Sequence, residues 1–190
     1  MKLTKRAEMI RQEGEAVSEI LELVRKQIEI LEMDYCIFLA EIIEGNLKFS
    51  DSPALEKWKS DELPHWEEKL AACAVDIEKY LAVIQENDNT FQPHLFDVKG
   101  GVKGCIESNL GYLERRKMEI ECEISIKEQI GIVLDKGMAR IMLKKLVDCK
   151  DMIYRLQWYL NDFDVNFEKD TKELLIKYSI SQNALTQAAV

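Results

Sequence analysis

Large apolar side chains recur at alternating spacings of three and four residues along the first quarter of the chain. This is the a/d row of a heptad repeat, and it predicts one long amphipathic helix over residues 4–45. The row consists of Ile10, Val17, Leu21, Val24, Ile28, Leu31, Tyr35, Phe38 and Ile42. A second apolar row beside it consists of Ile20, Leu23, Ile30 and Ile37. Two rows indicate more than one packing neighbour, because a two-stranded coiled coil needs only the narrow seam.

The same periodicity returns in the rest of the chain. Ser52-Pro53 is typical of a helix start, with Ser as the N-cap and Pro at the first helical position. The elements predicted after residue 45 are a short helix over 53–59, long helices over 62–86, 104–136 and 138–180, and a frayed tail over 181–190. Asp135-Lys136-Gly137 predicts a tight turn between the last two helices, although one continuous helix would also accommodate Gly137.

Residues 87–103 are the one long interruption of the pattern, with Pro93 inside and a glycine cluster at the end. A loop of this length is expected to be functional, mobile or both. The predicted long helices on either side of this loop are similar in length.

The sequence therefore predicts an all-α fold in a single domain over residues 1–180, an elongated antiparallel bundle of about four long helices with coiled-coil-like packing. Whether a second copy of the chain completes the core stays open.

Composition agrees with long helices and narrows the range of partners. The 190 residues include only 8 Gly and 3 Pro, which disfavours a turn-rich β fold. The net charge of −9 argues against binding to nucleic acid or to an anionic membrane, because both require clustered Lys and Arg. The five cysteines form no CxxC pair, and no apolar run is long enough to span a bilayer. These features favour a cytoplasmic protein with reduced thiols.

Motifs for metal or cofactor chemistry are incomplete in this sequence. The acidic residues of segment 162–173 match the spacing of a calcium loop, but Phe167 occupies the position that needs Gly. Glu62 and His65 match a Glu-x-x-His motif once, with Pro64 between them and no second copy. The glycines of segment 100–104 do not form a phosphate-binding loop. We therefore expect no catalytic residues, no metal and no cofactor.

Two groups of residues are candidates for docking on a partner. Phe91, His94, Leu95 and Phe96 lie in the long predicted loop, whereas Lys136, Arg140 and Lys144 follow one another at i, i+4 spacing. The leading hypothesis is a non-enzymatic interaction module (scaffold, adaptor or assembly factor) that docks helix faces or segment 87–104 on a protein partner and can also self-associate. One alternative is an acidic inhibitor, such as an immunity or anti-defence protein that occludes a basic nucleic-acid-binding surface. Another is an enzyme or cofactor protein without a recognisable motif.

Overall fold

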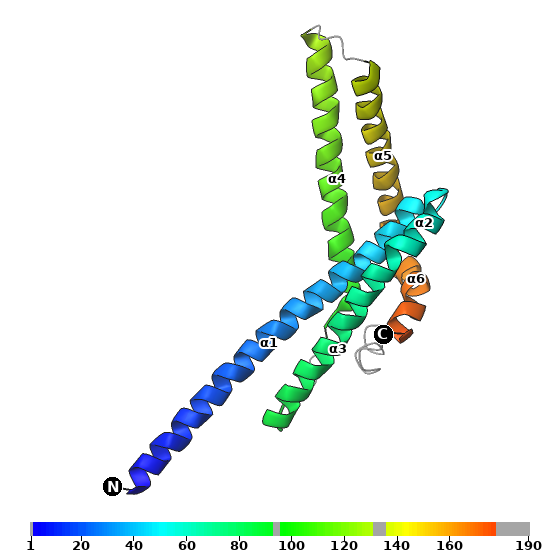
Figure 1. Ribbon diagram of the computed structural model, residues 1–190. Helices are drawn as coiled ribbons and strands as arrows, with labels where there is room; N and C mark the ends of the chain where they lie inside the picture. Colours follow the sequence, from blue (N-terminus) through cyan, green and yellow to red (C-terminus); the bar gives the residue numbers. More distant parts are fainter. Residues whose placement is uncertain (1, 93–95, 131–135, 178–190) are drawn as a thin grey trace.

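The computed structural model describes residues 2–92, 96–130 and 136–177 (Figure 1). Within these ranges the regular structure is entirely α-helical, so the all-α prediction is confirmed. The helices are α1 (Lys2–Phe49), α2 (Ala54–Asp61), α3 (Leu63–Asn87), α4 (Val98–Gln129), α5 (Lys136–Asn161) and α6 (Phe163–Lys177).

The helices form two arms that share a junction on the C-terminal half of α1 (Figure 1). One arm consists of α1 and α3, which run side by side in opposite directions. The other arm is the α4–α5 hairpin, which rises from the same part of α1 and diverges from it. Only the ends of the two arms, where they meet at the junction, can therefore share a common core.

The core lies at this junction and draws on five helices, α1, α3, α4, α5 and α6. From Ile28 onward, the predicted a/d row of α1 contributes the buried residues Ile28, Tyr35 and Ile42, which confirms the helix face assigned from the sequence. Leu39 and Ile43, which adjoin this row, are buried as well. The largest side chains with less than 2% exposure include Tyr35, Leu39, Ile42, Leu70, Ile77, Ile106, Leu156 and Tyr159. The second apolar row of α1 stays exposed, even though α1 contacts α3, α4 and α5. These neighbours pack around the first row instead.

The first helix runs past the predicted stop at Gly45 and ends at Phe49. Gly45 remains helical because the indole of Trp58 packs directly over it, where any side chain would intrude. Arg155 of α5 supports the extension, because its guanidinium donates to the Leu47 carbonyl at 3.0 Å. That carbonyl belongs to the last turn, where no partner exists within the helix. Tertiary contacts therefore override the local stop signal.

The fourth helix begins at Val98 rather than at residue 104, so the predicted loop 87–103 is shorter and the glycine cluster is helical. The Asp97 side chain caps the helix by accepting a hydrogen bond from the Gly100 backbone N–H at 2.8 Å. Gly101 is required because a Cβ there would lie 2.5 Å from the Cys36 sulfur of α1. The helix ends at Gln129 instead of residue 136.

The predicted helix over 138–180 is two helices, α5 and α6, divided at Asp162. The Asn166 side chain bridges the division by donating to the Tyr159 carbonyl at 3.0 Å. Lys136 and Gly137 lie in the first turn of α5, so the predicted turn is wrong for these two residues, and Asp135 lies outside the described residues. The tail 181–190 also lies outside them. The predicted helices 53–59 and 62–86 differ from α2 and α3 by one or two residues at each end.

Candidate functional site

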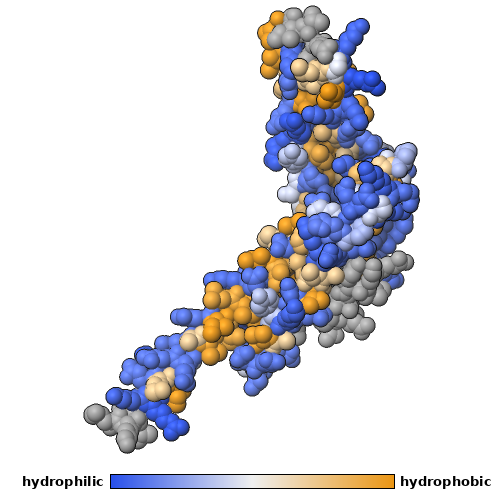
Figure 2. All heavy atoms as spheres, in the orientation of Figure 1, coloured by the Kyte–Doolittle hydropathy of each residue, from blue (hydrophilic) through white to orange (hydrophobic). Residues whose placement is uncertain are grey.

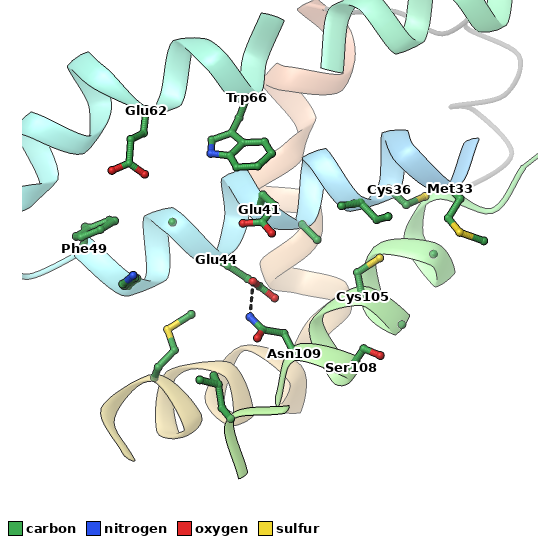
Figure 3. A pocket seen from close by; sticks show the side chains of 18 of the residues that line it. Met33, Cys36, Glu41, Glu44, Phe49, Glu62, Trp66, Cys105, Ser108 and Asn109 are labelled. Carbon is green, nitrogen blue, oxygen red and sulfur yellow. Dashed lines mark hydrogen bonds between the residues drawn. The ribbon is translucent and has the colours of Figure 1, made fainter. Parts of the chain in front are cut away.

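A cavity of about 1050 Å³ opens at the junction, between α1, the α2–α3 connection, α4 and α5 (Figure 3). Its walls combine acidic, aromatic and sulfur-containing side chains. Those that point toward the hollow include Cys36, Glu41, Glu44, Trp66, Cys105, Ser108 and Asn109. The cavity exists because the α4–α5 arm leaves α1 at an angle, so the two arms cannot close over it.

Glu44 is a buried carboxyl group of this cavity with a strongly raised pKa. Its side chain is only 9% exposed and accepts a hydrogen bond from the Asn109 amide at 2.5 Å, which joins α1 to α4. Burial raises the pKa of Glu44 to about 7, against the opposing effect of the Asn109 hydrogen bond, and the nearby Glu41 charge adds to the rise. This carboxyl group therefore changes its charge near neutral pH.

Cys36 and Cys105, two of the cysteines that line the cavity, are poor candidates for nucleophilic chemistry. Burial raises the pKa of Cys36 to about 12 and also raises the pKa of Cys105, with a further contribution from Glu44. Thiols with raised pKa values stay protonated at neutral pH, whereas the thiolate is the form that attacks substrates and binds metals. Among the described residues, no cluster of three or more His, Cys, Asp or Glu is placed to hold a metal ion.

The two aromatic candidates from the predicted loop that the structure describes have different environments. Phe96 is buried in the core, with its ring edge-on to Tyr35 at a centroid distance of 5.8 Å. Because α4 begins two residues later, Phe96 is held against α1 and is not an exposed docking side chain, contrary to the sequence-based hypothesis. Phe91 is partly exposed and lines a small hollow beside Ile28 and Ile84. His94 and Leu95 lie outside the described residues.

The three basic candidates lie together at the start of α5, where all of them are exposed. Lys136, Arg140 and Lys144 border a shallow hollow that also includes Leu143 and Val147. Apolar side chains continue along this side of the helix at spacings of four, seven and four residues. We define the α5 face as Lys136, Arg140, Leu143, Val147, Tyr154 and Trp158. Its four apolar members are each more than half exposed.

A second exposed apolar surface lies on the N-terminal part of α1. The end of α3 reaches α1 at Arg25, whose guanidinium pairs with Asp88 at 3.3 Å. Residues 5–20 project beyond this point, and every one of them is exposed. We define the α1 face as Ile10, Val17, Ile20 and Leu23, whose exposed fractions lie between 44% and 65%. Apolar side chains are visible at the surface of both arms in Figure 2.

The apolar residues of the α1 face were already visible in the heptad pattern, but nothing in the sequence marked them as exposed. Those of the α5 face have helical spacing as well, next to the half-buried row of Met142, Leu146 and Ile153. A periodic row signals that a helix face can be buried. It does not tell whether another segment of the same chain covers it.

No protein-family model, curated protein or solved structure matches this chain. None of the helices in the described part of the chain has a stretch long and apolar enough to cross a membrane.

Proposed function

We propose that this protein is a non-enzymatic interaction module, in the class of scaffolds, adaptors or assembly factors, that docks the α1 face on a helical protein partner. The observation that carries the proposal is the change in burial along one heptad row. The row is buried at Ile28, Tyr35 and Ile42, yet it continues to Ile10 and Val17 with no covering element among the described residues. A partner helix at this end of α1 would continue the packing of α3 over Ile10 and Val17. It would also cover Ile20 and Leu23 of the adjoining second row, which α3 leaves exposed.

The energetic case rests on the size of these side chains. Full burial of one large aliphatic side chain stabilises a complex by roughly 1.5–3 kcal/mol before the costs of association. Four such side chains on two adjoining rows of a helix contribute roughly 6–12 kcal/mol, which is of the same order as the cost of association. The loop residues are less suited to docking, because Phe96 already packs in the core. The five free cysteines are consistent with a cytoplasmic setting, where thiols stay reduced.

We expect that replacing both Ile20 and Leu23 with Gln abolishes capture of the partner without changing the fold. Both side chains are more than half exposed, and they lie in the part of α1 that α3 does not reach. Gln is a good helix former, so α1 should stay helical in the variant. The measurement is affinity capture from a lysate of cells that make the protein, quantified by mass spectrometry. Thermal unfolding followed by circular dichroism should be the same for the variant and the parent chain.

The matched control is Ser18→Gln, which places the same side chain on the polar side of the same helix segment. It should capture the same proteins as the parent chain. If the Ile20→Gln/Leu23→Gln variant also captured them all, the α1 face would not be the docking surface.

A further inference from the structure

The two exposed apolar faces carry opposite charge. Residues 5–24 of α1 contain five Glu and three Lys or Arg, a net charge of 3 − 5 = −2. All three basic residues precede residue 12, and residues 12–24 contain four Glu and no Lys or Arg. Residues 136–150 of α5 contain five Lys or Arg and one Asp, a net charge of 5 − 1 = +4. Charges of opposite sign around apolar centres favour correct pairing and faster association. The two faces are therefore complementary in charge as well as alike in apolar character.

The faces also match in length. The α1 face lies on residues 5–23, of which 5–20 project beyond the end of α3, and the α5 face extends over residues 136–158. At 1.5 Å per residue, both segments are about 30 Å long. A helix laid along another over part of this length can bring Ile20 and Leu23 of the α1 face into contact with Leu143 and Val147 of the α5 face.

The two faces of one molecule cannot meet, because they lie on different arms. The N-terminal end of α1 and the start of α5 point away from the junction in different directions (Figure 1). Both helices are anchored there by the core, α1 through Leu39 and Ile42 and α5 through Leu156 and Tyr159. A contact between the two faces therefore requires two molecules.

We propose that the partner of the α1 face is a second copy of this chain, on which it covers the α5 face. The inference rests on the proposed function and names the partner of the same surface. Ile20 and Leu23 of one copy pack against Leu143 and Val147 of the other. The acidic segment that includes Glu13 and Glu19 lies along the basic start of α5. The contact is heterologous, because it joins the α1 face of one copy to the α5 face of another, and every copy carries both faces.

A complementation experiment tests this contact by analytical ultracentrifugation over the micromolar range. The parent chain is expected to gain mass above the monomer as its concentration rises. The Ile20→Gln/Leu23→Gln and Leu143→Gln/Val147→Gln variants should each remain monomeric alone. Their equimolar mixture should associate again, because each variant retains the face that the other has lost. Continued association of the Leu143→Gln/Val147→Gln variant alone would overturn the proposal and indicate pairing of α1 with α1.

Charge reversal tests the electrostatic part of the same contact. Lys136→Glu/Arg140→Glu should weaken self-association by about tenfold, since it replaces attraction with repulsion. Adding Glu13→Lys/Glu19→Lys to the same chain should recover most of the affinity of self-association that the twofold variant has lost. If the fourfold variant were weaker than the twofold variant, the acidic segment of α1 would not lie along the start of α5, and the proposal would fail.

Failure of this inference can be separated from failure of the proposed function. A parent chain that stays monomeric overturns self-association. If the Ile20→Gln/Leu23→Gln variant then fails to capture a protein that the parent chain captures from lysate, the α1 face docks on a different partner and the proposed function stands. If the monomeric parent and the variant capture the same proteins, both proposals are wrong.

Discussion

Replacing Gly45 with Ala is expected to destabilise the protein by about 2–3 kcal/mol, although Ala is the better helix former. A Cβ at this position would lie 2.1 Å from the Cζ2 atom of Trp58. The indole cannot easily withdraw, because it is only 4% exposed and stacks on Phe49 at a centroid distance of 5.8 Å. The added methyl group must therefore push α2 away from α1 and loosen the packing between them.

The matched control for this substitution is Gly104→Ala in α4. A Cβ at Gly104 meets nothing within 4 Å, so the substitution should follow helix propensity and stabilise the protein by about 0.5–1 kcal/mol. Urea unfolding followed by circular dichroism gives both free energies of unfolding. The two substitutions are chemically identical, and the expected changes have opposite signs. A stabilising effect at both positions would contradict the close packing of Trp58 on α1.

The second large effect expected is a loss of stability as the pH rises through the titration range of Glu44. Burial raises the pKa of this carboxyl from 4.5 to about 7, so the folded state binds the proton more tightly than the unfolded state. The stabilising contribution is complete below pH 4.5 and is lost as the pH rises to about 7. A shift of this size corresponds to a cost of about 3 kcal/mol once the buried carboxyl is charged.

Glu44→Gln should remove this cost and leave the hydrogen bond in place. The amide stays neutral at every pH, and its oxygen can still accept the Asn109 N–H. The variant is expected to match the parent chain near pH 4.5 and to exceed its free energy of unfolding by about 2–3 kcal/mol at pH 8. Urea unfolding at a series of pH values between these limits measures the difference.

Glu22→Gln serves as the control for this titration, because Glu22 is exposed on the same helix. Its free energy of unfolding should follow that of the parent chain across the series. Parallel curves for the Glu44→Gln variant and the parent chain would show that the Glu44 carboxyl is not desolvated in the folded state.

Much of the helical architecture follows from local patterns. The a/d row predicted that Ile28, Tyr35 and Ile42 share one buried face, and the structure confirms it. Periodicity is legible in a single sequence because side chains on one face of a helix recur every three or four residues, whatever covers them. The scarcity of Gly and Pro supported the all-α class for the same reason.

The wrong helix boundaries at Gly45 and at residues 100–104 arose where a local sequence signal competes with a contact from another helix. The glycines of segment 100–104 resemble a loop, yet they are helical because Asp97 caps the helix and Gly101 allows close approach to Cys36. Gly45 resembles a helix stop, yet the helix continues under Trp58. The Asp97 cap is a local signal that the sequence-based prediction did not use. The contacts with Cys36 and Trp58 come from other helices, and their positions are not encoded in the local pattern.

The sequence by itself determined the all-α class, the apolar face of α1 and the opposite charges of the segments 12–24 and 136–150. Only the tertiary structure decided which parts of those faces are covered. Ile10 and Ile28 occupy the same heptad row and are the same residue type, but Ile10 is 61% exposed and Ile28 is 4% exposed. The difference arises because α3 ends near Arg25. Periodicity is a property of one helix, whereas burial depends on how far its neighbours extend.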